Sequence, residues 1–449
     1  MEFITDYRLE RYILDTRWET LPDAVKRRAR VCALDLMTAL ILGSHGRQFQ
    51  AGLDVAERYY QPGDIPVLRC TRGFGLLGAV EALGHAANSF DIDDGHNLAK
   101  GHPGASFVGG VLAAALENGS TLKEYITTLV VCYDVAVRIA LAMQSHYQYF
   151  HSTGAYGAVA TAAGMGRLMG LTKEQLNNAL SIADFHAPLT PVMRAVEYPS
   201  MNKDGVPFGS IIGAMAVTET LAGSSGKTHL LELAEERHWL DDLGENYEIL
   251  NLYFKPYTCC RWAHQPIQAS IDLMREKGIT ARDIESVTVH TYQAAARLSK
   301  IVPHETDEAQ YNIAYPVAAA LVYGDVGYPQ VCEQALGDQR VLDMMQRLAF
   351  TVDPAVEAQF PAKRLAWVEI MCKDGRRCQS PTCAAPGEWE DQVDEAWIRK
   401  KFTRITKPFL KPDEQERLME LFLEEPLELP IRTVVEEVNR CLTPIGTEY

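Results

Sequence analysis

Residues 91–118 read DIDDGHNLAKGHPGASFVGGVLAAALEN, a charged loop followed directly by an apolar run. Two glycines in the loop interrupt any regular element. Pro103 favours a helix start, because its fixed φ suits the first helical position and its missing N–H is not needed there. The run Ala105–Leu116 therefore predicts a buried helix. His102 would lie at or just before its N-terminus, where backbone N–H groups can face an anion.

Other stretches of the first half share this small-residue composition. Glycine and alanine are dense over residues 153–170 and 205–223 as well as 104–118. Small side chains let helices approach closely, so these stretches predict tightly packed helices. Two segments, beginning at Thr121 and Thr172, have the Thr-x-x-Glu or Thr-x-x-Gln spacing of a capping box at a helix start. The first half is therefore expected to be helical.

The pattern changes after residue 278. Ile284–Tyr292 alternates with β-branched residues, which predicts a strand. Leu365–Cys372, followed by a Lys-Asp-Gly turn, predicts a second strand, and Arg377–Gln379 predicts a returning one. Helical patterns lie around or between these strands at residues 265–277, 309–323 and 394–403.

The length of 449 residues exceeds what one core usually holds and indicates two domains. We expect a mainly α protein in which a large all-helical domain comprises residues 1–269 and 393–449. A smaller α+β domain, residues 270–392, is expected to be inserted near the C-terminal end of the helical one.

The composition is that of a globular protein, with 47% hydrophobic and 23% charged residues and a formal net charge of -16. The acidic balance argues against a nucleic-acid partner, which needs a basic face. No run reaches the ~18 apolar residues of a membrane span, and no targeting segment is visible at the start. The ten cysteines form no Cys-x-x-Cys pair, which argues against structural zinc or an iron–sulfur motif. We therefore expect a cytoplasmic protein with reduced thiols and no membrane partner.

Three carboxylates and two imidazoles lie within twelve residues of the charged loop: Asp91, Asp93, Asp94, His96 and His102. An imidazole titrates near neutrality and can take or give a proton. The carboxylates have two interpretations, since they can orient the histidines or bind a divalent ion. The loop does not follow the EF-hand scheme, and we favour orientation, with no metal and no cofactor. A polar turn with solvated charges is the plain alternative.

Four further segments occur with this loop in an order and at separations that resemble the MmgE/PrpD family. That family includes 2-methylcitrate dehydratases, cis-aconitate decarboxylases and iminodisuccinate epimerases. Each segment is a weak signal alone, but the set is specific, and the similarity runs from Leu21 to Phe402. The segments are FHSTGAYG (150–157), MNKDG (201–205) with Gly209, KPYTCCRWAH (255–264) and QYNIAYP (310–316).

The resemblance implies a site that makes or quenches a carbanion next to a carboxylate. It places His102 and His151 in or at the site as proton-transfer groups. Asp91 and Asp93 are expected to orient them. Tyr315 would hydrogen-bond the substrate or donate a proton, although its sequence pattern fits a buried core tyrosine nearly as well.

Positive charge for the substrate carboxylates is expected from Lys203 and Lys255, through charge-assisted hydrogen bonds. Arg261 offers a bidentate grip, or else forms an interdomain salt bridge. His96 is a further candidate for substrate contact. Because Lys255 precedes the expected domain junction and Tyr315 follows it, we place the site in the cleft between the domains.

One set of site residues of this kind can catalyse three different reactions. Loss of a β-hydroxyl makes a dehydratase, return of the proton to the other face makes an epimerase, and loss of CO2 makes a decarboxylase. We expect a cofactor-independent lyase of the hydratase/dehydratase type on a small anionic di- or tricarboxylate, acting as a homodimer. Two features depart from part of the family and leave the exact substrate open: Gly95 stands where members often have Thr or Ser, and the run from Asp91 to His102 is one residue longer than in the cis-aconitate decarboxylases. The motifs DDGH (93–96) and GHPG (101–104) resemble the epimerase-like branch more closely. A non-catalytic carboxylate-binding protein is the remaining alternative.

Overall fold

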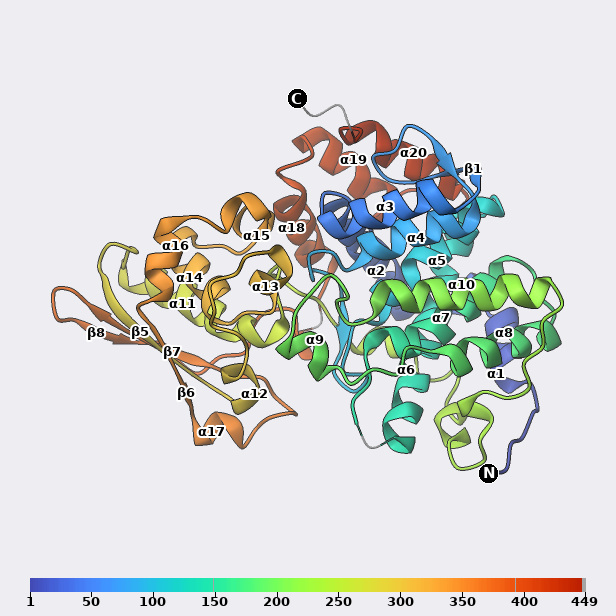
Figure 1. The fold of residues 1–449 in the computed structure, drawn as a ribbon, viewed down its shortest axis with the longest axis horizontal. Coiled ribbons are helices and arrows are strands. Elements are labelled where there is room, and N and C mark those ends of the chain that lie inside the picture. Colours follow the sequence, from blue (N-terminus) through green and yellow to red (C-terminus); the bar gives the residue numbers. More distant parts are fainter. Residues whose placement is uncertain (148, 392, 446–449) are drawn as a thin grey trace.

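The helix predicted after the charged loop is α5 (Pro103–Glu117), which begins at the proline and is buried throughout as far as Leu116. The computed structural model describes residues 1–147, 149–391 and 393–445 of the chain. Four neighbouring helices pack around α5, as Figure 1 shows on the right of the molecule. They are α4 (Leu76–Ala87), α6 (Leu122–His146), α7 (Thr153–Leu168) and α10 (Val206–Leu221).

The close packing predicted for the small-residue stretches is confirmed. A Cβ atom on Gly109 of α5 would lie 2.6 Å from the backbone nitrogen of Gly84 in α4. A Cβ atom on Gly213 of α10 would lie 2.4 Å from the backbone oxygen of Ala158 in α7. Real Cβ contacts are not that short, so the helix axes can approach this closely only where glycine stands.

The two predicted capping boxes of the first half also mark helix starts in the structure. The Thr172 hydroxyl accepts the N–H of Gln175, whose side chain accepts the N–H of Thr172 in return, a full capping box. Thr121 caps its helix in one direction only, since it accepts the Glu124 N–H while Glu124 pairs with Arg167. The other helices here are α1 (Arg8–Asp15), α2 (Asp23–Gly43), α3 (Arg47–Tyr59), α8 (Lys173–His186) and α9 (Met193–Glu197).

One sequence expectation needs correction at α6. This helix of 25 residues is long and apolar enough to cross a membrane by length and composition, although the sequence analysis found no such run. In the structure, 94% of its apolar window is buried inside the protein. It packs against α5, α7 and α2, so its apolarity is accounted for by its place in the core.

A four-stranded sheet forms after residue 283, on the left in Figure 1. Its strand order is β6-β5-β7-β8, with β5 parallel to β6 and antiparallel to β7, and β7 antiparallel to β8. The strands are β5 (Ile284–Thr291), β6 (Leu348–Val352), β7 (Trp367–Cys372) and β8 (Arg377–Gln379). The accompanying helices are α11 (His264–Lys277), α12 (Gln293–Ala296), α13 (Thr306–Gln310), α14 (Ala314–Tyr323), α15 (Tyr328–Val331), α16 (Gln339–Met345) and α17 (Pro354–Glu357).

Two details of this region differ from the sequence prediction. Strand β6 was not predicted, because it is a short edge strand with little of its surface buried. The helix expected over 309–323 is interrupted between α13 and α14, where the Asn312 side chain accepts the N–H of Tyr315 at 2.8 Å and starts a new helix.

Two hydrophobic clusters hold the chain together, and they interlock. The second cluster contains the sheet and α11, α14 and α16, and it starts at Tyr257, before the expected boundary at residue 270. It also contains Leu42, Phe90 and Ile92 from the first half of the chain. The last helices, α18 (Glu395–Thr406), α19 (Pro412–Leu423) and α20 (Ile431–Cys441), pack back on the first half, with α18 and α19 against α2.

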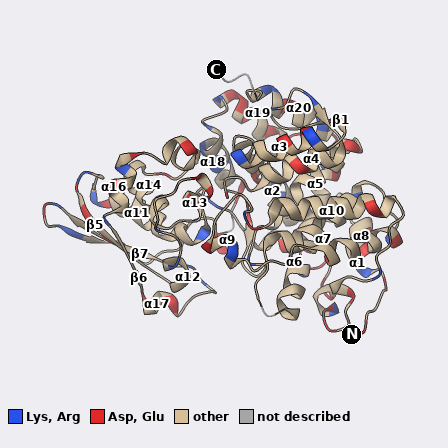
Figure 2. Cartoon of the chain, viewed as in Figure 1, with Lys and Arg blue, Asp and Glu red and all other residues tan. Residues whose placement is uncertain are grey.

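Three short two-residue strands and one longer strand complete the fold. β1 (Pro62–Pro66) pairs with β2 (Gly73–Phe74), and β3 (Gly95–His96) pairs antiparallel with β4 (Leu252–Tyr253). The second pairing ties the charged loop to the segment that leads into Lys255. Figure 2 shows charged residues gathered near α9, between the mostly uncharged α7 and α10 region and the sheet.

Candidate active site

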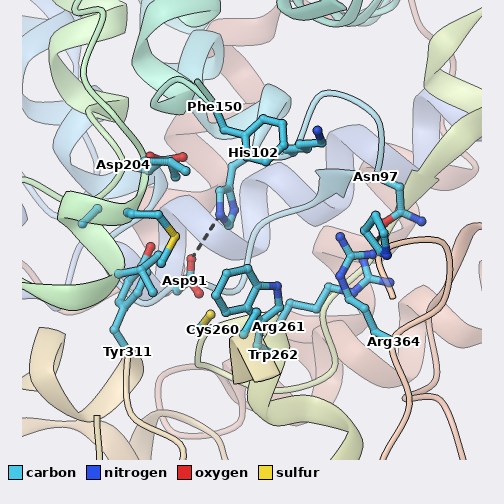
Figure 3. A pocket seen from close by; sticks show the side chains of 18 of the residues that line it. Asp91, Asn97, His102, Phe150, Asp204, Cys260, Arg261, Trp262, Tyr311 and Arg364 are labelled. Carbon is cyan, nitrogen blue, oxygen red and sulfur yellow. Dashed lines mark hydrogen bonds and ion pairs between the residues drawn. The ribbon is translucent and has the colours of Figure 1, made fainter. Parts of the chain in front are cut away.

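A cavity of about 550 Å³ lies where the charged loop meets α9 and the segments around residues 260–262 and 360–364. Figure 3 shows His102 at its centre, with Asp204 and Tyr311 on one side and Arg261 and Arg364 on the other. The cavity is thus lined by the charged loop and α9 from the first half of the chain and by segments from the region that contains the sheet. Its walls combine acid/base groups on one side with guanidinium groups on the opposite side.

The charged loop folds into a tight turn in front of α5. The N–H of His96 donates to the oxygen of Gly101 at 3.0 Å, and the N–H of His102 donates to the Thr153 hydroxyl at 3.1 Å. Asp91 and Lys100 have positive φ angles of 51° and 58°, a region that side chains seldom adopt. The loop is therefore held in a strained conformation that fixes where its side chains point.

His102 is joined to two carboxylates and a lysine. Its Nδ1 lies 3.1 Å from Asp93 Oδ2 and 2.8 Å from Lys255 Nζ, and its Nε2 lies 3.8 Å from Asp91 Oδ1. Lys255 Nζ donates to Asp91 Oδ1 at 3.0 Å. Lys255 and both aspartates are almost fully buried, while His102 lines the cavity.

The charges of this cluster stabilise one another. Burial alone would raise the pKa of Asp93, but Lys255 and His102 outweigh it and hold that pKa well below its usual range. Burial and Lys255 lower the pKa of His102, yet Asp93 and Asp91 prevail and leave it above the ordinary value. Despite burial, the two aspartates also raise the pKa of Lys255. Lys255 is therefore charged, and protonation of His102 is favoured.

The cluster offers the donor set of a metal site, but Lys255 occupies its centre. Ligand atoms of Asp91, Asp93 and His102 all lie within 4.8 Å of one another. The Lys255 ammonium lies 3.0 Å from Asp91 and 3.9 Å from Asp93, where it supplies the positive charge that a cation would bring. A metal ion bound there would face direct repulsion from this lysine. The absence of a metal stays a prediction.

Asp94, whose role the sequence left open, points away from this cluster. It accepts the N–H of Gly104 at 3.1 Å in the first turn of α5, and the Tyr133 hydroxyl donates to its other oxygen. Burial raises its pKa to about 7. Asp94 therefore fastens the N-terminus of α5, where a carboxylate is favourable.

The two lysines expected to hold substrate carboxylates are already engaged by the protein. Lys255 is buried within the cluster around His102 and does not line the cavity. Lys203 Nζ donates to Gln310 Oε1 at 2.6 Å and lies 2.9 Å from Asp307 Oδ1. Each ammonium is neutralised locally, so neither is placed as a free grip for a substrate anion.

Arg261 and His96 do line the cavity, and both are also held by protein partners. Arg261 forms an ion pair with Glu388 and stacks over the ring of Tyr253, 3.3 Å from its centroid. The salt bridge that the sequence left as an alternative for Arg261 is therefore present. His96 Nε2 lies 3.3 Å from Glu248 Oε2, and its Nδ1 accepts the N–H of Ala99.

His151 and Tyr315 are not brought to the cavity. The His151 ring packs against two tyrosine rings, and its Nε2 lies 3.2 Å from the oxygen of Met143. Burial lowers its pKa, as expected for a core histidine. The Tyr315 hydroxyl donates to the oxygens of Gln330 and Ala335, inside the second hydrophobic cluster. Neither side chain is among the described residues that line the cavity.

Sequence reasoning missed several charged or polar residues that line the cavity in the described part of the chain, among them Asn97, Lys100, Glu197, Asp204, Arg297, Tyr311 and Arg364. Asp204 directly follows Lys203, and Tyr311 lies in the quoted segment 310–316, so a signal was present for both. Arg364 had no sequence signal, because only the fold brings residue 364 to the cavity. Its Nη1 donates to Asn97 Oδ1 at 2.7 Å, and its Nε has no hydrogen-bond partner among the described residues.

Fold and site define a mainly helical protein with a histidine, aspartate and lysine cluster at a cavity that also carries guanidinium groups. The chain belongs to the MmgE/PrpD family. The N-terminal domain of that family matches residues 7–244, and its C-terminal domain matches residues 257–425. The second match extends past both ends of the expected 270–392 domain.

Relatives with named activities are distant. The cis-aconitate decarboxylase-like protein oryM of Aspergillus oryzae is 22% identical over 91% of this chain and 91% of its own length. The cis-aconitate decarboxylase of Aspergillus terreus is 22% identical over 68% of this chain and 69% of its own. The 2-methylcitrate dehydratase of Escherichia coli K12 is 24% identical over 59% of this chain and 60% of its own.

Proposed function

We propose that this protein is a lyase that moves a proton next to a carboxylate of a small di- or tricarboxylate. The observation that carries the proposal is His102 on the cavity wall, with Nδ1 within hydrogen-bond distance of both Asp93 and Lys255. This arrangement holds an imidazole in place and tunes its proton affinity, as acid–base catalysis requires. The relatives named as dehydratase and decarboxylase are enzymes of the same general type.

A carbanion beside a carboxylate needs positive charge around the substrate oxygens. Among the described residues, four lysines and arginines line the cavity. Arg261 and Arg297 are paired with Glu388 and Glu197. Lys100 Nζ stacks on the Phe150 ring, 3.2 Å from its centroid, and Arg364 donates to the Asn97 amide oxygen. Neither has a carboxylate partner within the described part of the chain, so their charges are available to substrate carboxylates. We assign to Lys100 and Arg364 the grip that the sequence analysis gave to the lysines at positions 203 and 255.

Dehydration is the favoured reaction within this proposal, with epimerisation and decarboxylation as alternatives from the same intermediate. The reaction is proposed to need no metal, since the Lys255 ammonium stands among the candidate ligands. We further propose a cytoplasmic homodimer in which the α+β region, residues 270–392, is a domain inserted into the helical one. A carboxylate-binding protein without activity is the rival interpretation.

The test is an NMR screen of di- and tricarboxylates in D2O, which reports dehydration, decarboxylation, epimerisation and hydrogen exchange at once. We expect one acid to be converted by the wild type, with and without EDTA, and far more slowly by His102→Gln. Thermal stabilisation by an acid that shows neither exchange nor conversion would support the binding protein instead. Activity that EDTA abolishes and a divalent ion restores would overturn the metal-free proposal.

A further inference from the structure

Asp204 is a buried carboxylate with one oxygen bound and one oxygen free. It lies in the turn before α10 and is 3% exposed. Its Oδ2 accepts the backbone N–H of Thr153 at 2.9 Å and also the Thr153 hydroxyl. Its Oδ1 is buried and has no hydrogen-bond partner among the described residues. Leaving such an oxygen without a donor is costly, so a proton or a ligand is expected to complete it.

Asp204 also stands between two cavities. It lines the cavity that contains His102, and it lines a second cavity of about 530 Å³ on the other side of α9. The second cavity is lined mainly by polar residues and reaches Tyr198, which is 78% exposed. A proton held by Asp204 therefore has a route to solvent that does not pass through the substrate.

Building on the function proposed above, we infer that Asp204 is the base that takes the proton from the substrate carbon through Oδ1, and that His102 is the acid. Figure 3 shows the two side chains on adjoining parts of the same wall. In a dehydration, the C–H electron pair forms the new carbon–carbon double bond. The C–O bond breaks with its pair on oxygen, which takes a proton from His102 and leaves as water. Asp204 then releases its proton to water in the second cavity, and His102 takes one up again.

The surroundings of His102 suit a proton donor. A lysine ammonium can only donate, so the 2.8 Å contact from Lys255 requires a lone pair on Nδ1 and leaves the ring hydrogen on Nε2. If Nδ1 instead donates to Asp93, the raised pKa of His102 favours the imidazolium, which carries a hydrogen on Nε2 as well. In both arrangements Nε2–H is available to a leaving group.

Asp91 is the competing base, because it lines the same cavity and its Oδ2 also has no hydrogen-bond partner in the described part of the chain. Its Oδ1, however, accepts a hydrogen bond from the ammonium of Lys255 at 3.0 Å, so this carboxylate is already engaged in a buried ion pair. The donors on Asp204 are the neutral N–H and O–H of Thr153. The hydrogen-bond geometry therefore favours Asp204 as the base.

The groups that face Asp204 come from several elements. His102 and Asp91 face it from the charged loop, Thr153 and Tyr156 from α7, and Tyr311 from the segment after α13. The neighbouring Lys203 is turned to Asp307. Burial raises the pKa of Asp204 to about 6, against the lowering effect of His102 and the Thr153 hydrogen bonds. The carboxyl is thus ionised at neutral pH and more basic than an ordinary aspartate.

The test separates the base from the acid by measuring two rates in D2O with the acid that the wild type converts: exchange of the substrate C–H and formation of product. Asp204→Asn should lose both rates by roughly 10²–10⁴-fold, the usual contribution of a general base. His102→Gln should lose product formation by a similar factor but keep exchange within about threefold. Exchange retained by Asp204→Asn, or lost in His102→Gln, would overturn the assignment.

Three controls sharpen the result. Asp184→Asn changes another carboxyl whose pKa burial raises, but one that lines neither cavity, and both rates should stay unchanged. Asp91→Asn should keep more exchange than Asp204→Asn, and the reverse order would make Asp91 the base. A wild type with neither exchange nor conversion on any acid of the panel would instead refute the proposed function itself.

A second variant keeps the inference testable if Asp204→Asn does not fold. Thr153→Val removes the hydroxyl that donates to Asp204 Oδ2. A carboxylate that loses a hydrogen-bond donor binds its proton more tightly. The pH below which the rate of C–H exchange falls, the acidic limb of its pH profile, should therefore move to a higher value. Thr153→Ser keeps a hydroxyl and should leave the limb in place. A limb unmoved by Thr153→Val would contradict the role of Asp204.

Discussion

The N-termini of α5 and α7 look alike in sequence and differ in what surrounds them. Each helix is rich in small residues, and a histidine stands just before each one, His102 and His151. His102 meets two aspartates and a lysine at a cavity, whereas His151 meets tyrosine rings and the oxygen of Met143. Residues from segments that are distant in sequence, above all Lys255, therefore determine which of the two similar helix starts forms part of the candidate active site.

The largest expected effect is on turnover. His102→Gln should reduce kcat by roughly 10²–10⁴-fold, because it removes a proton-transfer group that acts in the transition state. His151→Gln should leave kcat within about threefold of the wild type. Steady-state kinetics of the two matched variants measure this directly. Equal losses in both would restore the two-histidine mechanism that the sequence predicted and would mean that the two helix starts have the same role.

The next effect is on stability. Lys255→Met leaves Asp91 and Asp93 buried without their counter-charge, and breaking a buried ion pair in this way costs about 3–5 kcal/mol. Urea unfolding followed by circular dichroism gives the free energy of unfolding. Lys277→Met, at an exposed lysine, is the control and should stay within about 0.5 kcal/mol. A small loss for Lys255→Met would mean that the cluster is not held by its charges.

The two histidines should also respond to pH with opposite signs. The raised pKa of His102 stabilises the folded protein below the unfolded pKa of about 6.5, and that contribution is lost as the pH rises through the folded value. The lowered pKa of His151 contributes stability above about pH 6.5, lost as the pH falls towards the folded value.

Unfolding free energies between pH 5 and pH 8.5 check this prediction. The difference in the free energy of unfolding between the wild type and His102→Gln should become smaller as the pH rises. The corresponding difference for His151→Gln should become smaller as the pH falls. Slopes of the same sign for both variants would show that the charged neighbours of His102 do not set its proton affinity.

The smallest effect concerns substrate binding beside the α5 site. Arg364→Ala should raise KM about tenfold, the equivalent of ~1.4 kcal/mol for one lost charge-assisted hydrogen bond, with little change in kcat. Arg275→Ala, at an arginine that does not line the cavity, should change neither. An unchanged KM for Arg364→Ala would indicate that Lys100 or another cation that lines the cavity binds the substrate carboxylates instead.

Local patterns predicted much of the fold. The small-residue helices, the capping box at Thr172 and strands β5, β7 and β8 lie where the sequence placed them, because periodicity and caps act over a few residues. Edge strand β6 was not predicted, because it depends on pairing with a strand that is distant in sequence. The break before α14 was not predicted either, because it depends on the hydrogen bond of the Asn312 side chain.

The site was harder to predict than the fold. The charged loop was identified because its unusual residues are adjacent in sequence. Lys203 and Lys255 were predicted to hold substrate carboxylates, but the sequence could not show that Lys203 is paired with Asp307 and Lys255 with the aspartates of the loop. Arg364 reaches the cavity only through the fold, and Tyr315 turns away from it for the same reason.

The interlocking of the two hydrophobic clusters bears on how the molecule comes apart. Phe90 and Ile92 flank Asp91 and pack into the cluster built around the sheet, while α5, at the other end of the loop, belongs to the helical one. The loop therefore belongs to the packing of both clusters, and neither cluster can unfold without disturbing the loop. Heating should melt the chain in one cooperative step, and a ligand bound at the loop should delay the melting of both halves together.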